Sequence, residues 1–434
     1  MTAPLPSAPS SELGALPTAS PGTAKPDDVV PPARACPRHP ARTVRFDAPT
    51  SPLPRGEPED VGVDGRRLDE LVLAAERATS DTLIVVKDGK VLVDRRGRDE
   101  PIETRSITKG LAALAVLALV DDGVLESLDV PLSRFFREFA EGEKARVTLR
   151  HVLSHTSGLR HSATDADALN AQRDRTRYAR GLAVTTPPGA VFSYSNEASQ
   201  LLSGVIEIAS GRPADELVRA RVFAPLGIGE VPWKRDRAGN PQTYYGASLR
   251  PWDLARIGLM MIAGGRVPAL PGATTDARVL SETSIDRLFT PSERYSGYGL
   301  SFWLDPPWQQ GPDALASTGL SPELRKRLAD LDGVAFPSGE GYFAAARERV
   351  GHDVALRLRE LHRKRKGPLV PAPGLARSLI ALGGLGQRLE VHRDTRLVAV
   401  RQHVRRPESG RDEDRVTFRA MQEHLHRLEA PCTP

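Results

Sequence analysis

The chain has 434 residues, of which 40% are hydrophobic and 26% charged, so a globular protein with a sizeable core is expected. No run of about 18 apolar residues occurs, and we therefore predict no membrane span. The 60 basic residues are nearly balanced by 55 acidic ones, which argues against a nucleic-acid partner despite the formal charge of +5.

The first 52 residues are rich in Pro, Ala, Ser and Thr and have no apolar period, so we predict a disordered tail at 1–52 and one domain at 53–434. The tail has neither the basic start nor the apolar stretch of a secretory signal. We expect a cytoplasmic protein for the chain as written, or an exported one if its start is mis-assigned. Cys36 and Cys432 lie near opposite ends, and we expect no structural disulfide between them.

The first ordered elements have clear periodic signals. Residues 65–78 carry apolar side chains at helical spacing. Two β-branched runs, 82–87 and 90–95, flank Asp88-Gly89, which predicts a hairpin because both turn positions favour positive φ. A helix of small and branched apolar residues is predicted over 106–120.

The rest of the chain is predicted as a helical block followed by strands. In chain order we expect a mostly helical region over 124–245, a helix at 251–263, strands at 298–304, 387–391 and 397–403, and a final helix at about 414–428. This order favours a sheet packed by the first and last helices, with an inserted helical lobe.

Residues 305–372 stand apart as a predicted insertion with Pro and Gly at both ends. Its stretch 357–366 holds six basic residues, which could mark a polyanion or membrane patch. We favour the solvated face of a helix, since Glu360 and Asp353 interrupt the charge and no aromatic residues interleave.

Ser106 and Lys109 stand three residues apart at the start of the predicted helix 106–120, so their side chains share one helix face. Serine is a poor nucleophile unless a base takes its proton, and a lysine can be that base if burial lowers its pKa. The apolar residues 111–120 would bury this helix, whose start also offers free backbone N–H groups. The motif alone fits equally a capping serine beside a solvated lysine.

Tyr194 and Asn196 form a second candidate element. A tyrosine near an ammonium group can relay a proton, and an asparagine amide can accept from lysine and donate to a substrate carbonyl. A core tyrosine followed by a turn asparagine is the structural alternative.

These two elements, in their order and separation, resemble the serine β-lactamase-like superfamily, in its class C β-lactamase, penicillin-binding protein and esterase branch. Residues 149–159 look like that family's H-x-L-x-H-T-S-G-L segment, and residues 250–258 look like one of its helices. The similarity covers most of 58–265 and 296–303, and again 375–402. It implies that His151 and His155 lie in a structural loop beside the site. The alternatives are a metal site or direct catalysis by one of these histidines. We favour the structural loop, because no glutamate with H-E-x-x-H spacing accompanies them.

The family's third element is a K/H-x-G strand segment whose following residue supplies an oxyanion-hole N–H. The best match is Ala381-Leu382-Gly383-Gly384, where the cationic position is Ala381. An amide donor at Gly384 would survive this change, because an oxyanion hole needs N–H groups and not side chains. A contact from a Lys or His side chain to a substrate carboxylate would be lost, because Ala381 carries no charge. An alternative register with Leu385 at the family's His position also lacks a charge.

The resemblance implies an α/β (α+β) fold of the β-lactamase/transpeptidase type. An antiparallel sheet with flanking helices would be built from about 58–105 and 265–430, with an inserted helical lobe over about 106–250. It also implies acyl transfer by Ser106, Lys109 and Tyr194, with Asn196 assisting, Gly384 in the oxyanion hole, and neither metal nor organic cofactor.

The favoured activity is an esterase or amidase acting on small acyl substrates, because Ala381 removes a carboxylate anchor. A β-lactamase or D-Ala-D-Ala carboxypeptidase is the first alternative, and a non-catalytic binding protein on the same fold is the second. The oligomeric state is left open.

Overall fold

The computed structural model describes residues 36–48, 50–160, 166–274, 276–311, 313–336, 339–363, 367–404, 421 and 424–429. All of them belong to the unit formed by residues 35–434. None of the helices in these ranges is long and apolar enough to cross a membrane.

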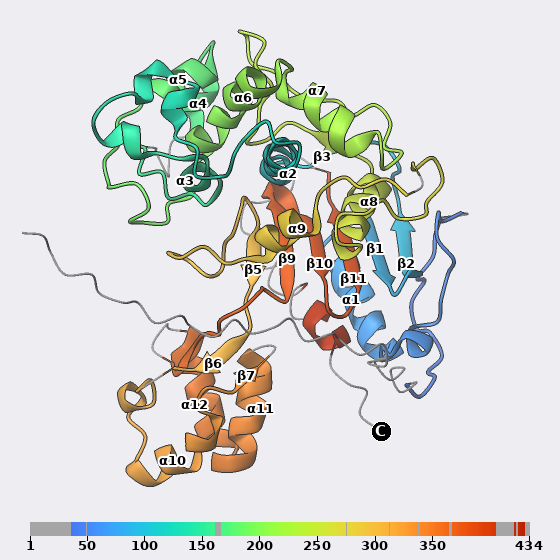
Figure 1. The fold of residues 1–434 in the computed structure, drawn as a ribbon. Coiled ribbons are helices and arrows are strands. Elements are labelled where there is room, and N and C mark those ends of the chain that lie inside the picture. Colours follow the sequence, from blue (N-terminus) through green and yellow to red (C-terminus); the bar gives the residue numbers. More distant parts are fainter. Residues whose placement is uncertain are drawn as a thin grey trace, which may run out of the picture. The chain divides into compact units, whose positions relative to one another are not determined.

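The centre of this unit is a six-stranded antiparallel sheet in the order β2-β1-β11-β10-β9-β5 (Figure 1). The strands are β1 Thr82–Lys87, β2 Lys90–Arg96, β5 Trp303–Asp305, β9 Ser378–Gly383, β10 Gln387–His392 and β11 Leu397–Gln402. Pairing of β1 with β11 joins the two ends of the domain, with Thr82 opposite Gln402. The predicted hairpin is present, with Asp88 and Gly89 at φ 48° and 74°.

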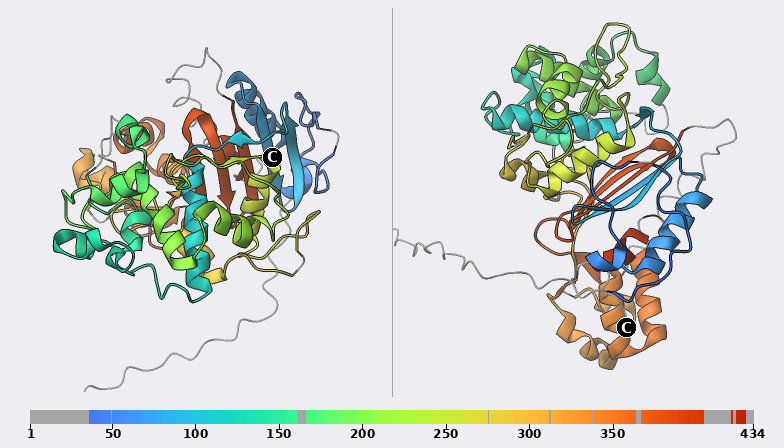
Figure 2. Two further views of the ribbon diagram at one scale, coloured as in Figure 1. Left: turned by 90° about the horizontal axis from the view of Figure 1, so that it is seen from above. Right: turned by 90° about the vertical axis from the view of Figure 1, so that its right-hand side faces the viewer.

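Helices cover both faces of the sheet, as the two views in Figure 2 show. On one face α1 (Gly65–Arg77) packs with Met421, Leu425 and Leu428 against apolar side chains of β1, β2 and β11. On the other face lie α2 (Ile107–Asp121) and α8 (Pro251–Ile262). Because α2 has helices on one side and the sheet on the other, its residues 107–119 are all buried.

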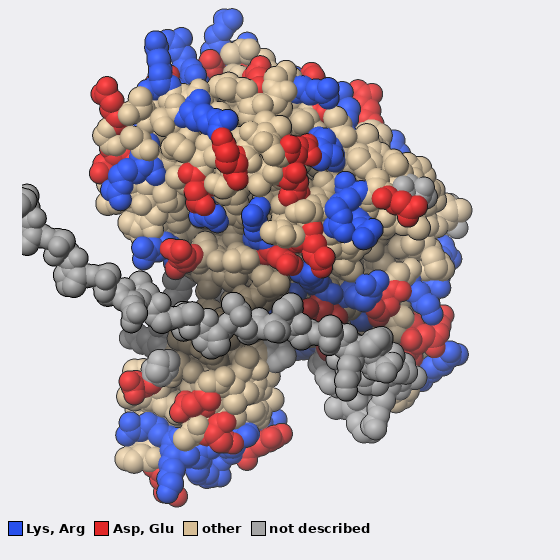
Figure 3. Space-filling model, in the orientation of Figure 1, with Lys and Arg blue, Asp and Glu red and all other residues tan. Residues whose placement is uncertain are grey.

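A helical lobe extends from the α2 side of the sheet. It contains α3 Leu149–Leu153, α4 Ala166–Ala171, α5 Arg175–Gly181, α6 Asn196–Ser210 and α7 Ala214–Val218. A short ribbon of β3 Ile102–Glu103 and β4 Ser248–Leu249 links the entry and the exit of the lobe. The helix α9 (Glu282–Phe289) leads back to the sheet. Lys and Arg side chains are interspersed with Asp and Glu over the lobe on the face in Figure 3.

The predicted strand 298–304 is wrong in most of its length. The chain turns between Gly299 and Phe302, and Ser301 has a φ of 62° with its amide donating to the Leu153 carbonyl at 2.8 Å. Only Trp303–Asp305 pairs with β9. The predicted final helix falls mostly on residues outside the described ranges, but residues 424–429 are helical.

Residues between β5 and β9 form a small structure of their own. It has a three-stranded sheet of β7 Ala335–Phe336, β6 Trp308–Gln310 and β8 Leu369–Pro371, with helices α10 Pro322–Arg327, α11 Gly339–Val350 and α12 His352–Arg363. A separate apolar cluster that includes Leu328, Tyr342 and Leu358 holds these elements together.

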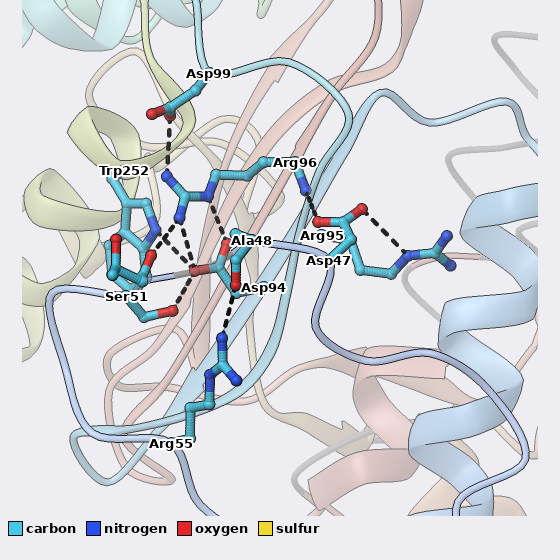
Figure 4. Close-up of polar contacts among 10 residues, drawn as sticks. Asp47, Ala48, Ser51, Arg55, Asp94, Arg95, Arg96, Asp99 and Trp252 are labelled. Carbon is cyan, nitrogen blue, oxygen red and sulfur yellow. Dashed lines mark hydrogen bonds and ion pairs between the residues drawn. The ribbon is translucent and has the colours of Figure 1, made fainter.

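The described part of the predicted tail is ordered against β2. Phe46 and Arg55 form parallel bridges with that strand, and the fully buried carboxylate of Asp94 accepts hydrogen bonds from Ser51, Arg96 and Trp252 (Figure 4). These bonds connect the segment 46–55 to β2 and to α8. The segment therefore covers an edge strand that would otherwise expose its backbone groups.

The expectation that Cys36 stays out of a disulfide is wrong: Cys36 is disulfide-bonded. The sequence has one other cysteine, Cys432, which lies outside the described residues. Spacing in the sequence could not reveal this bond, because a disulfide requires proximity in space and not along the chain.

Candidate active site

Ser106 lies at the turn that opens α2. Arg105 before it adopts a left-handed φ of 54°, which is rare for a residue other than glycine and makes the chain turn sharply into the helix. Ser106 makes no side-chain capping bond, although it occupies the N-cap position. The Ser106 hydroxyl therefore does not cap the helix, and the residue is partly exposed to solvent.

Lys109 points back along α2 to the serine. Its Nζ donates to Ser106 Oγ at 3.1 Å, to Asn196 Oδ1 at 2.8 Å and to the Tyr244 carbonyl at 2.9 Å. Only 1% of Lys109 is exposed, so it is not the solvated lysine of the structural alternative. Burial lowers the pKa of Lys109 from its ordinary value, against the opposing effect of Tyr194.

Tyr194 and Asn196 come from the start of α6 in the helical lobe. Ser195 caps this helix by accepting from the Ala198 amide at 3.0 Å, which fixes the two residues on either side of it. The ring of Tyr194 lies over Lys109, with Nζ 4.8 Å from the ring centroid. The structure thus brings Ser106, Lys109, Tyr194 and Asn196 together.

His155 supports Tyr194 from the loop after α3. Its ring centroid is 4.4 Å from that of Tyr194, and its Nδ1 accepts from the Ser195 amide at 3.2 Å. His151 instead closes the start of α3, where its Nδ1 accepts from the Thr148 amide at 3.2 Å. Among the residues that the structure describes, no group of three or more His, Cys, Asp or Glu side chains is arranged to hold a metal ion.

The end of β9 packs on the turn that carries the serine. A Cβ on Gly383 would lie 2.2 Å from the Thr104 carbonyl oxygen and 3.0 Å from Arg105 Cβ, so only glycine fits there. Gly384 follows at the exposed tip of the hairpin, and within the described ranges neither its amide nor that of Ser106 donates to an acceptor. Ala381, at the family's cationic position, is buried in the apolar core.

Sequence reasoning missed the third acceptor for Lys109, the carbonyl of Tyr244. Two hydrogen bonds hold the Tyr244 side chain in place: its hydroxyl donates to Asn170 Oδ1 at 2.6 Å and accepts from Arg175 at 3.0 Å. A backbone carbonyl has no signature in a sequence, so no motif could have indicated it.

Comparison with known proteins gives concordant matches. A family model described as beta-lactamase matches residues 67–351. Esterase EstB of Burkholderia gladioli is 34% identical over 196 residues, which are 37% of this chain and 50% of EstB. Penicillin-binding protein 4 of Amycolatopsis lactamdurans is 32% identical over 136 residues, 30% of this chain and 35% of that protein.

The alignments with the curated relatives reach between about a third and three fifths of the relatives' lengths. Among solved structures, a penicillin-binding protein homologue from Caulobacter crescentus superposes with a TM-score of 0.53 at 15% identity, over 85% of this chain and 99% of that one. This likeness shows a β-lactamase/transpeptidase-like fold, in agreement with the expected fold class.

Proposed function

This chain belongs to the β-lactamase family, and on that premise we propose that it is a serine hydrolase that forms an acyl-enzyme on Ser106. The observation that carries the proposal is the 3.1 Å hydrogen bond between Lys109 Nζ and Ser106 Oγ, made by a lysine that is almost completely buried. A buried amine with a lowered pKa can be neutral near physiological pH, and a neutral amine can accept the serine proton.

Each proposed step uses a group of this chain. The Ser106 oxygen attacks the carbonyl carbon of the substrate while its proton passes to Lys109. The amides of Ser106 and Gly384 stabilise the oxyanion. Tyr194, coupled to Lys109, donates a proton to the leaving group, and Asn196 orients the lysine and the substrate. Water then attacks the acyl-enzyme, with its proton returning along the same path.

We favour esters or amides with small acyl groups as substrates. Ala381 offers no cation for a substrate carboxylate at the position where penicillin-recognising members of the family have one. EstB, named an esterase, is one of the relatives that match this chain. A β-lactamase or D-Ala-D-Ala carboxypeptidase is the second candidate, because other relatives are named penicillin-binding proteins.

Intact-mass measurement of the full chain tests the proposal. Incubation with p-nitrophenyl acetate should add one acetyl group, and the addition should be absent from Ser106→Ala. Incubation with a penicillin reports on the second candidate through the mass of a penicilloyl adduct. If neither compound nor a fluorophosphonate probe modifies Ser106, the chain is a non-catalytic binding protein on this fold.

The disulfide at Cys36 supports a location in an oxidising compartment and not in the cytoplasm, where thiols are kept reduced. Intact mass under non-denaturing preparation, with and without a reductant, tests whether the bond is present in the purified protein.

A further inference from the structure

A hollow lined by aromatic rings lies beside the proposed active site. Its volume is about 490 Å³, and it is lined by Ala190, Val191, Phe192, Arg294, Tyr295 and Trp303. The rings of Phe192 and Tyr295 pack at a tilt of 36° with centroids 4.7 Å apart. The Trp303 ring packs edgewise on both, at 6.3 Å from Phe192 and 6.5 Å from Tyr295.

Trp303 connects this hollow to the catalytic side chains. Its indole is nearly parallel to the Tyr194 ring, at 5.9 Å and 16°, and Tyr194 in turn lies over Lys109. The hollow therefore begins one ring beyond Tyr194, the residue proposed to protonate the leaving group. A group attached to the leaving-group oxygen can extend in this direction.

The lining of the hollow combines large apolar side chains with the Arg294 guanidinium, and the described residues that line it include no acidic side chain. Val191 is 50% exposed, and Phe192, Tyr295 and Trp303 are each partly exposed, so large apolar side chains are concentrated at this point of the surface. The Nε of Arg294 donates to the Gly189 carbonyl at 2.6 Å, which joins the two loops that form the walls. The rings are thus held in place before any ligand arrives.

This hollow offers a recognition element in a protein that lacks the cationic anchor at Ala381. Flat apolar groups bind well against aromatic rings, because offset stacking adds to the free energy gained by removing both surfaces from water.

We propose that the hollow of Phe192, Tyr295 and Trp303 binds the leaving group of the substrate, and that the preferred substrates are esters of extended aromatic alcohols. This inference rests on the proposed function, because it takes Tyr194 as the acid on the leaving-group side.

A pair of acetate esters tests it. Phenyl acetate and 2-naphthyl acetate have the same acyl group and leaving groups of similar acidity, and we assign the second ring of the naphthyl group to the contact with Tyr295. We expect kcat/KM for the naphthyl ester to exceed that for the phenyl ester by roughly three- to tenfold, the size of one aromatic contact. Tyr295→Ser should abolish that ratio, and Tyr295→Phe, which keeps the ring, should preserve it.

Leu356→Ser is the matched control, since Leu356 is 50% exposed on α12 and outside the hollow. Equal rates for the two esters, or a ratio that Tyr295→Ser leaves unchanged, would overturn the subsite while leaving the serine hydrolase intact.

Direct binding separates the subsite from the chemistry. Tryptophan fluorescence can measure the binding of 2-naphthol to the Ser106→Ala protein. The affinity should fall by the same roughly three- to tenfold factor when Tyr295→Ser is added to this variant. If this binding depends on Tyr295 while the wild-type protein hydrolyses neither ester and is not labelled at Ser106 by a fluorophosphonate, the subsite is supported and the hydrolase is refuted. Absence of binding would refute the subsite.

Discussion

At the scale of single residues, the proposed proton transfer depends on Lys109. Lys109→Met should lower kcat/KM for p-nitrophenyl acetate by about 10²- to 10⁴-fold, the usual contribution of a general base, with little change in fold content. The measurement is initial rate together with fluorophosphonate labelling of Ser106.

Lys144→Met is a matched control for that variant. Lys144 is a partly buried lysine whose pKa is likewise lowered by burial, but its Nζ donates to the Arg180 carbonyl at 2.7 Å and not to a hydroxyl. If the fluorophosphonate labels Ser106 in the Lys109→Met variant as fast as in the wild type, Lys109 is not the base.

The pH dependence of the reaction follows from the same burial. Lys109 accepts a proton only as a neutral amine, and burial lowers its pKa below the ordinary value of 10.5. The rate of acylation should therefore rise with pH and reach a plateau below pH 10.5. A stopped-flow profile of kcat/KM between pH 5 and 10 measures it. A rate independent of pH throughout this range would contradict a titrating base.

The sequence predicted which side chains meet at the site but not all of their partners. Residues i and i+3 of a helix share a face in any structure, so Ser106 and Lys109 could be paired before the fold was known. Tyr194 and Asn196 required the resemblance, because no local rule brings α6 to the start of α2. The Tyr244 carbonyl could not be predicted by either route.

At the scale of secondary structure, the hairpin between β9 and β10 places an amide beside the turn that carries Ser106. Gly384 is outside the positive-φ region that Leu385 and Gly386 occupy, and Gly383 before it is extended, with φ −124° and ψ 152°. Both are conformations that a proline at 384 accepts. Gly384→Pro should therefore remove the N–H with little strain and lower kcat by about 10²- to 10³-fold, the usual loss for one oxyanion donor.

Gly384→Ala is the control, because a Cβ at this position meets nothing within 4 Å and the amide is retained. Steady-state kinetics with p-nitrophenyl acetate compares the two variants, and circular dichroism checks their folding. Equal activity of Gly384→Pro and Gly384→Ala would exclude this amide from the oxyanion hole.

Periodicity predicted the long elements well and the short ones poorly. The helix α2 and the strands β10 and β11 differ from their predicted bounds by at most one residue at either end. In α2 the apolar residues run almost without interruption, and in β10 Leu389 and Val391 alternate with polar residues, so the period is clear in both. The predicted strand 298–304 contained the same kinds of residues, but Gly299 and Ser301 allow a turn that the Leu153 carbonyl then fixes. Such a tertiary contact overrides a local β preference.

At the scale of the whole molecule, a buried ionic network joins the sheet to the C-terminal helical residues. Glu390 on β10 accepts from Arg388 and pairs with His392 Nε2 at 2.9 Å. His392 Nδ1 lies 2.6 Å from Glu429, which also pairs with Arg377. Nothing in the sequence indicated this network. Residue 429 is distant from β10 along the chain, so only the tertiary structure brings Glu429 to His392.

The network makes stability depend on pH in a definite direction. Burial alone would lower the pKa of His392, but Glu390 and Glu429 raise it to about 9 from an ordinary 6.5. Burial alone would raise the pKa of the two carboxyls, but Arg388 and His392 hold Glu390 at about 2, and His392 with Arg377 holds Glu429 at about 2.

A raised histidine pKa stabilises the fold fully below pH 6.5, and this stabilisation is lost as the pH rises through about 9. A lowered carboxyl pKa stabilises the fold above pH 4.5, and this stabilisation is lost as the pH falls toward 2. The contribution of the network is therefore largest between pH 4.5 and 6.5.

His392→Gln tests this dependence. The variant should melt at a lower temperature at pH 6, because two buried carboxylates lose the cation that they share and keep only one arginine each, Arg388 on Glu390 and Arg377 on Glu429. The loss should be at most about 3–5 kcal/mol, the range for breaking a buried ion pair. The difference in Tm from the wild type should shrink as the pH rises from 6.5 to 9, where the wild-type histidine loses its proton. Thermal melts across this range measure the difference. The control His352→Gln, at an exposed histidine of α12, should have the Tm of the wild type at every pH.

A constant difference in Tm between His392→Gln and the wild type from pH 6 to 9 would show that His392 is not protonated in the folded state. The network would then be a set of hydrogen bonds without a buried cation at that position.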